Sequence, residues 1–221
     1  MTTDRRVLAD QLMLVLLRAD GKVISGGYTD IMLGGAVLSD LILRGRIDIA
    51  GKGESVKPGR VVVRSPAPVD DDLLDTALQT LIDKPGSRPS SVVRKLVKRQ
   101  TVLERLAREK IVTASTHRVV GLFPVTHWPS ADGRPAAQAR RGLQRVVDGG
   151  ARPDPESVAL VLLLLAARTL HHVLPTDDRK AQRVRVLHLA QENWATPTIR
   201  KALQDVADGV SSAVAAVDIG E

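Results

Sequence analysis

The sequence predicts a mainly α-helical protein: a compact, single-domain helical bundle around a buried central helix, with two small β-hairpins. Apolar residues recur at the three- and four-residue spacing of helices along most of the chain. Aromatic residues make up only 2% of it, so Leu, Val, Ile and Ala must fill the core. The longest apolar run, 158–167, is shorter than the roughly 20 residues that span a bilayer, and it is typical of a helix buried on all sides. With 221 residues and no long linker, the chain is expected to form one domain, 1–221.

The N-terminal third is predicted to form two helices and a hairpin. Apolar side chains share one face of the first helix, 7–18, and of the second, 29–43. The second helix contains adjacent glycines, 34–35, which permit close packing against a neighbouring element. Alternating polar and apolar residues then predict a hairpin that pairs 46–49 with 60–63.

The middle of the chain is predicted to form two further helices. The helix over 70–81 opens with three consecutive aspartates, which interact favourably with the N-terminal end of a helix dipole. The next helix covers 91–110, with Ser90 as its N-cap and a break near Gln100.

The remainder is predicted to form a second hairpin and four helices. The hairpin pairs 111–113 with 119–123 around a turn at 115–117. Each of the helices has its own apolar stripe. They cover 136–147, 155–173, 177–192 and 197–216.

The sequence contains no recognisable catalytic or metal-binding constellation. Cysteine is absent, which excludes disulfides and thiolate ligands. The five histidines do not have the spacing of a zinc site. The nucleophile elbow of serine hydrolases and the glycine-rich loops that bind phosphates are also missing. We therefore expect a protein that is not an enzyme and that has no catalytic residues, no metal and no cofactor.

The informative feature is basic charge. The chain has a formal net charge of +7, which favours polyanionic partners such as nucleic acid or an anionic membrane surface. The charges are interpreted either as a solvated helix face or as the footprint of an anionic surface. A second basic cluster would enlarge the field if it lay on the same side. The first cluster is Arg94, Lys95, Lys98, Arg99, Arg105, Arg108 and Lys110, and the second is Arg134, Arg140, Arg141 and Arg145.

A basic helix followed by a hairpin also resembles the recognition helix and wing of winged-helix proteins. The segment 106–112 links the two elements here. The alternative function is therefore that of a nucleic-acid-binding regulator.

Six segments, in order and spacing, resemble the Golgi phosphoprotein 3 family. The most specific holds the sequence Leu43-Arg44-Gly45-Arg46, where a helix turns into a strand. The resemblance covers about 8–217 and implies a compact helical domain with small surface hairpins. The segments are 33–47, 72–78, 103–107, 111–113, 123–127 and 160–166.

Eukaryotic members of this family bind phosphatidylinositol 4-phosphate on Golgi membranes and the cytoplasmic tails of glycosyltransferases. Their lipid pocket uses a tryptophan, whose position corresponds to Tyr28, and three arginines. The arginine positions are occupied by Gly34, Gln100 and Leu103, so the resemblance implies weakly selective binding. The residues expected to bind lipid head groups are Tyr28, Arg94, Lys98 and Arg99.

The resemblance implies a non-catalytic peripheral membrane adaptor that binds anionic lipid and protein clients. We expect it to be cytoplasmic and peripheral on the cytoplasmic face of a membrane. Arg outnumbers Lys, and Ala and Val are abundant, which indicates a GC-rich bacterial genome.

Overall fold

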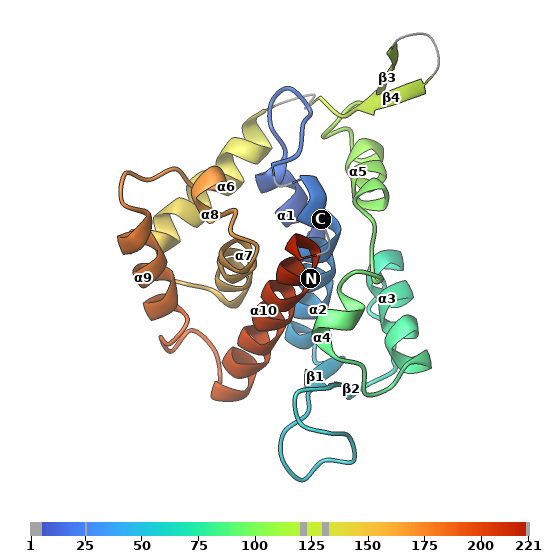
Figure 1. Cartoon of the computed structure of the whole chain (residues 1–221), viewed down its shortest axis with the longest axis vertical. Helices are drawn as coiled ribbons and strands as arrows, with labels where there is room; N and C mark the ends of the chain where they lie inside the picture. The colour runs from blue at the N-terminus through green and yellow to red at the C-terminus, as the bar shows by residue number, and fades with distance from the viewer. Residues whose placement is uncertain (1–5, 25, 120–122, 130–132, 220–221) are drawn as a thin grey trace.

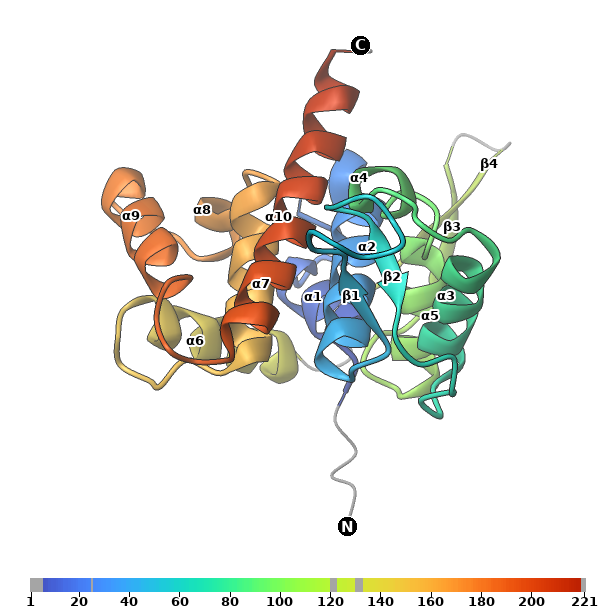
Figure 2. The same ribbon diagram turned by 90° about the horizontal axis from the view of Figure 1, so that it is seen from below.

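The computed structural model describes residues 6–24, 26–119, 123–129 and 133–219. Helices dominate, and two short antiparallel hairpins lie at the periphery (Figures 1 and 2). In chain order the elements are α1 (Leu8–Leu16), the 3-10 helix η1 (Gly26–Tyr28), α2 (Thr29–Leu43), β1 (Ile47–Ile49), β2 (Val61–Val63), α3 (Asp72–Asp83), α4 (Pro89–Val92), α5 (Arg99–Arg108), β3 (Ser115–Val119), β4 (Phe123–His127), α6 (Arg134–Val147), α7 (Pro155–Ala166), α8 (Leu170–Val173), α9 (Arg179–Leu189) and α10 (Pro197–Asp218).

Two helices, α2 and α7, form the centre of the hydrophobic core. Helix α7 is buried from Val158 to Leu164, which confirms the predicted central helix, although Leu165 is only partly buried. Helix α2 is buried from Ile31 to Ile42 and contacts more of the fold. Its neighbours are α1, α3, α5, α7, α10, η1 and β1.

The glycine pair in α2 permits close packing, as predicted. An ideal Cβ on Gly35 would lie 2.6 Å from side-chain atoms of Leu163 in α7 and of Val210 in α10. A Cβ on Gly34 would lie 1.9 Å from the carbonyl oxygen of Val93. The absence of side chains at both positions therefore sets how closely α2 approaches its neighbours.

The segment 43–46, which carries the most specific resemblance to the family, has a structural role at the end of α2. Gly45 adopts a φ of 67°, which favours glycine and reverses the chain at the end of the helix. The N–H of Arg46 donates to the carbonyl of Leu41 at 2.9 Å, and the guanidinium of Arg44 binds the buried carboxylate of Asp40 at 2.8 Å. The motif therefore closes α2 and directs the chain into β1.

The first hairpin agrees with the prediction, whereas the second is displaced. Strand β1 pairs with β2 through Ile47 opposite Val63. In the second hairpin, β3 pairs with β4, so the predicted turn at 115–117 is part of a strand. The residues expected to form its first strand are bonded elsewhere, because Ile111 N–H donates to Leu106 O at 2.9 Å and Thr113 N–H to Pro129 O at 3.0 Å.

The helix predicted over 91–110 is two helices, α4 and α5. The break lies at 93–98 rather than near Gln100, which is inside α5. Lys98 has extended backbone angles, and the Asp30 carboxylate accepts the N–H of Arg99 at 2.8 Å. A contact from α2 therefore fixes the start of α5. Ser90 is also not an N-cap, because α4 begins with Pro89.

The helix predicted over 155–173 ends early, at Ala166. Arg168 adopts a φ of 57°, and the N–H of Thr169 donates to Leu164 O at 2.9 Å, which closes α7 with a reverse turn. The short helix α8 follows. By contrast, the predicted acidic N-terminus of α3 is confirmed, since the Asp71 carboxylate accepts the N–H groups of Leu73 and Leu74 at 3.1 Å each.

Among the described residues, no helix combines the length and apolar character needed to cross a membrane.

Candidate functional site

The structure gathers the predicted lipid-binding residues around the start of α2. Tyr28 immediately precedes this helix, and Asp30 lies in its first turn. The Asp30 carboxylate lies 3.5 Å from the Nζ atom of Lys98, in addition to accepting the N–H of Arg99. We call Tyr28, Arg94, Lys98 and Arg99 together the α2 entry face.

The C-terminal part of α10 contacts this face. The hydroxyl of Tyr28 donates to the Asp218 carboxylate, and the guanidinium of Arg94 donates to the carbonyl of Ala213. In Figure 2 the end of α10 projects beyond α2 and α4. Arg94 is partly buried by its contact with α10, whereas Lys98 and Arg99 are exposed. Arg94 is therefore a packing residue, and Lys98 and Arg99 carry the accessible charge of this face.

None of the family's arginine positions contributes a cation here. Gly34 leaves no room for a side chain against the backbone of Val93. Leu103 is 3% exposed and belongs to the hydrophobic core. Gln100 is exposed, and its amide donates to Glu104 at 2.8 Å. The local packing thus excludes an arginine at Gly34 and places Leu103 in the core.

Tyr28 also lines a pocket of about 560 Å³, whose cations were not predicted from the sequence. Arg18 and Lys22 come from the tight turn after α1, in which Arg18 N–H donates to Lys22 O at 2.8 Å. Arg168 and His172 come from the reverse turn after α7 and from α8. We call this cavity the Tyr28 pocket.

Positive charge dominates the Tyr28 pocket. Its only carboxylate among the described lining residues belongs to Asp20, which lies 3.4 Å from Arg18 Nε. The Lys22 backbone N–H, helped by Arg18, lowers the pKa of Asp20. Arg168 lies 3.3 Å from the Asp218 carboxylate at the rim. An anionic group of a ligand that entered the pocket would therefore contact Arg18, Lys22 and Arg168.

A second cationic groove, of about 320 Å³, lies between α3 and α5. Lys95, Lys98 and Arg108 line it, with Asp72 opposite. Among the described residues, Lys95 and Arg108 make no ion pair, so this part of the predicted basic stretch is an exposed positive surface.

Arg105, by contrast, is structural. Its Nη2 atom lies 3.1 Å from Asp10 and 2.8 Å from Asp71, so it joins α1, α3 and α5. The side chain of Asp10 is 1% exposed. Burial raises the pKa of Asp10, against the opposing effect of Arg105. We call these three residues the Arg105 clamp.

Replacing Arg105 with Met is expected to lower the free energy of unfolding by about 3 kcal/mol at neutral pH, because it leaves buried Asp10 charged and unpaired. The loss should shrink as the pH falls. Because the pKa of Asp10 is raised in the folded protein, protonation of Asp10 stabilises the fold. This contribution is complete when the pH is below the ordinary pKa of aspartate, and it disappears as the pH rises through the raised pKa. Urea unfolding at several pH values measures both effects. Arg108→Met, on the exposed side of α5, is the control and should change stability by less than about 0.5 kcal/mol. A loss that does not depend on pH would contradict this assignment.

The second predicted basic cluster does not extend the α2 entry face. It lies on α6, which packs on the opposite side of α1 from α5 (Figure 1). The Arg140 guanidinium donates to the carbonyls of Val15 at 2.9 Å and Leu17 at 2.6 Å, and so closes the end of α1. Burial, with a contribution from Arg18, lowers the pKa of Arg140.

Among the described residues, no cluster of three His, Asp or Glu side chains has a geometry suited to a metal ion. The side chains of His117 and His127 lie outside the described part of the structure. His171 and His172 have ring centroids 3.8 Å apart, and burial, followed by the charges of His172 and Arg179, lowers the pKa of His171.

Comparison with known proteins identifies a family. A search among proteins of curated function gives no match. The sequence model of the family described as Golgi phosphoprotein 3 (GPP34) matches residues 8–206, which includes every helix from α1 to α9 and the start of α10. The chain therefore belongs to the Golgi phosphoprotein 3 family.

Proposed function

We propose that the protein is a non-catalytic peripheral adaptor that docks on anionic phospholipid surfaces through the α2 entry face and the adjoining Tyr28 pocket. The observation that carries the proposal is the convergence of Arg18, Lys22 and Arg168 beside Tyr28. Lys98 and Arg99 add exposed charge at the first turn of α2, which Tyr28 immediately precedes. Membership of the Golgi phosphoprotein 3 family supports the adaptor role.

The same observations favour binding that follows membrane charge rather than head-group identity. The family's arginine positions supply no cation, so the arrangement that distinguishes phosphatidylinositol 4-phosphate in eukaryotic relatives is replaced by cations from other segments. An anionic head group is expected to lie between Arg18 and Arg168, with the membrane surface against Lys98 and Arg99.

The double variant Lys98→Gln/Arg99→Gln is expected to bind anionic vesicles about 30-fold more weakly, because each Lys or Arg close to an anionic surface contributes about 1 kcal/mol. Arg18→Gln/Arg168→Gln should have a similar effect. Binding of the unmodified protein should fall steeply between about 0.1 and 0.5 M salt, since salt screens exposed charges. Sedimentation with phosphatidylserine vesicles, and with phosphatidylinositol 4-phosphate vesicles of equal charge, measures these changes.

The matched control is Lys52→Gln/Lys57→Gln, which neutralises two exposed lysines in the loop between β1 and β2, at the far end of α2. It should bind like the unmodified protein. Vesicle binding that persists at about 0.5 M salt would contradict the proposal, as would its absence at low salt. Tight binding to duplex DNA, lost in the Lys98/Arg99 variant and accompanied by no vesicle binding, would favour the winged-helix alternative.

A further inference from the structure

Helix α9 exposes hydrophobic side chains that nothing in the fold covers. Its inner face packs Gln182, Val186 and Leu189 into the protein. On the outside, Val184 is 58% exposed and Leu187 is 42% exposed. Ile219, at the end of the described chain, is the only other exposed large hydrophobic residue in the part that the structure describes. Exposed apolar groups that gather beside a cavity are typical of interaction sites.

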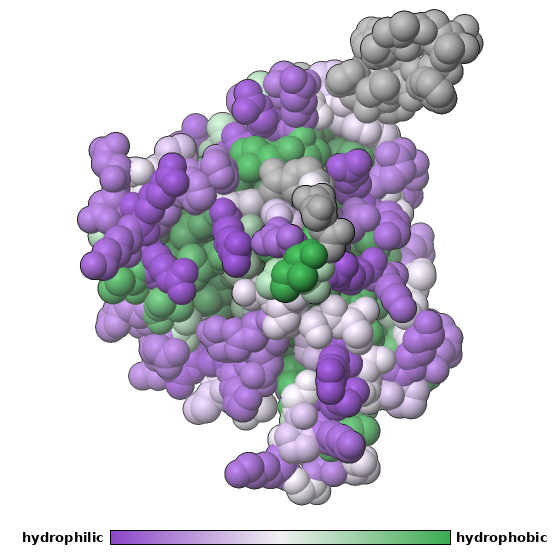
Figure 3. Space-filling view, in the orientation of Figure 1, coloured by the Kyte–Doolittle hydropathy of each residue, from purple (hydrophilic) through white to green (hydrophobic). Residues whose placement is uncertain are grey.

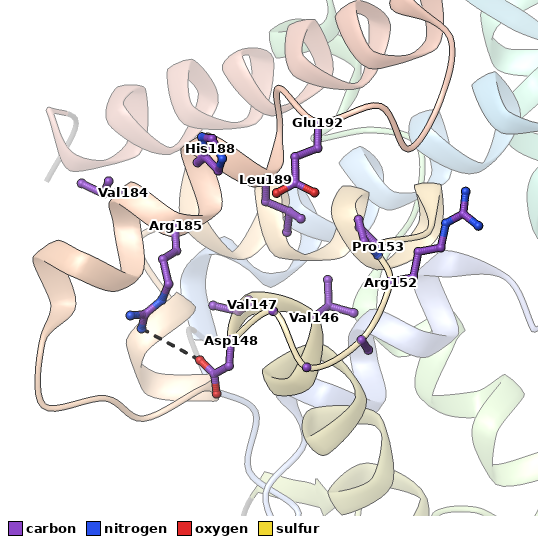
Figure 4. Close-up of a pocket in the computed structure, with 13 residues that line it drawn as sticks. Val146, Val147, Asp148, Arg152, Pro153, Val184, Arg185, His188, Leu189 and Glu192 are labelled. Atoms are coloured by element: carbon purple, nitrogen blue, oxygen red, sulfur yellow. Dashed lines mark ion pairs between the residues drawn. The ribbon is translucent and has the colours of Figure 1, made fainter.

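A groove of about 750 Å³ adjoins this helix, between α9 and the loop that joins α6 to α7 (Figure 4). Its apolar wall includes Val147 from α6 and Val184 and Leu189 from α9. The carboxylate of Asp148 and the guanidinium of Arg185 lie across it, 3.9 Å apart. The groove therefore offers apolar surface at a volume that accommodates several side chains of a docked segment.

Positive charge flanks the exposed hydrophobic pair on α9, and the carboxylates of Asp148 and Glu192 line the groove beside it. Arg179, Lys180, Arg183 and Arg185 are all exposed. Among the described residues, the only ion pair that involves any of them is the one between Arg185 and Asp148, at 3.9 Å. Figure 3 shows hydrophobic side chains between strongly hydrophilic ones at the edge of the molecule that α9 forms. We call the outer side of α9 together with the groove the α9 surface.

We propose that the α9 surface binds an acidic amphipathic segment of a partner protein. The apolar side chains of such a segment would cover Val184 and Leu187 and enter the groove, and its carboxylates would pair with Arg183 and Arg185. Charge complementarity selects an acidic partner over a basic one. The groove favours a peptide over a lipid head group, because its wall includes the apolar side chains of Val147, Val184 and Leu189.

This inference is independent of the proposed membrane docking. Helix α9 lies at the edge of the molecule opposite α3 and α5 (Figures 1 and 2). No described residue that lines the groove beside α9 also lines the Tyr28 pocket or belongs to the α2 entry face. The protein would therefore hold a partner through α9 while the α2 entry face contacts an anionic surface.

The test uses a labelled synthetic helical peptide with leucines at i, i+3, i+4 and i+7 and glutamates elsewhere, and fluorescence anisotropy as the readout. A second peptide has lysine in place of every glutamate. The acidic peptide is expected to bind the full chain, and the basic peptide is expected not to bind. Val184→Ser/Leu187→Ser should weaken binding of the acidic peptide at least about tenfold, because the double substitution removes the apolar contact.

A charge-reversal variant distinguishes loss of the binding surface from damage to the fold. Arg183→Glu/Arg185→Glu should abolish binding of the acidic peptide and allow binding of the basic peptide. Damage to the fold would not produce this new binding. Lys52→Glu/Lys57→Glu is the control and should leave acidic-peptide binding unchanged. Failure of the acidic peptide to bind, or equal binding by the Val184/Leu187 variant, would overturn the inference. A loss of vesicle binding in the Val184→Ser/Leu187→Ser variant, which keeps the net charge unchanged, would also overturn it, by assigning this surface to the membrane.

Discussion

Replacing Leu163 with Asp is expected to abolish soluble folding. Leu163 is 1% exposed, and its side chain packs against α2 where Gly35 allows close approach. The change removes a buried leucine, which stabilises the fold by about 1.5–3 kcal/mol, and places a carboxylate in an apolar environment at a cost of several kcal/mol more. The sum is comparable to the whole stability of a typical domain, about 5–15 kcal/mol. The soluble fraction after expression and the far-ultraviolet circular dichroism of any soluble protein measure the result.

The control is the same change at an exposed leucine of another helix. Leu187→Asp in α9 should alter the free energy of unfolding by less than about 0.5 kcal/mol, because Leu187 is 42% exposed and lies outside the hydrophobic core. If Leu163→Asp yielded a soluble protein that unfolds cooperatively near the original midpoint, the position of α7 in the core would be wrong.

Replacing Gly34 with Ala is expected to lower the free energy of unfolding by about 4 kcal/mol, above the usual cost of overpacking. The added Cβ would lie 1.9 Å from the carbonyl oxygen and 2.6 Å from the carbonyl carbon of Val93. Both partners are backbone, so neither a rotamer change nor a flexible side chain can relieve the clash. The midpoint of urea unfolding measures the loss.

The same substitution at Gly142 is the matched control. Gly142 lies in the exposed part of α6, and a Cβ there would meet nothing within 4 Å. Because alanine favours the helix, Gly142→Ala should stabilise the protein by up to about 1 kcal/mol. Equal effects of the two substitutions would contradict the close approach between α2 and the segment that contains Val93.

Periodicity predicted the elements whose structure depends on their own residues. Amphipathic spacing located α1, α3, α6 and α10 to within a few residues, and alternation located the first hairpin. The errors occur where a distant residue fixes the chain. Asp30 determines where α5 begins, and Pro129 accepts the hydrogen bond that keeps Thr113 out of β3. A local pattern does not contain such contacts.

The candidate site was likewise predicted only where its residues lie close together in the sequence. The basic stretch and Tyr28 were predicted from the sequence, and the structure brings Lys98 and Arg99 of that stretch to the first turn of α2, next to Tyr28. The Tyr28 pocket was missed because Arg18 and Arg168 are far apart in sequence and because 155–173 was expected to be one uninterrupted helix. The sequence does not show that Arg168 adopts a positive φ. This backbone conformation ends α7 and places Arg168 in the turn that lines the pocket.

The Arg105 clamp also has a consequence for the order of folding. Asp10 and Arg105 are separated by 95 positions, and Asp71 and Arg105 by 34. Closing such long loops costs chain entropy before any contact repays it, so the clamp cannot assist the first collapse of the chain. Until Arg105 reaches α1, a charged Asp10 opposes burial of that helix. We therefore expect the N-terminal helix to complete its packing only after residues beyond 100 have been synthesised, so that the two halves of the chain finish folding together.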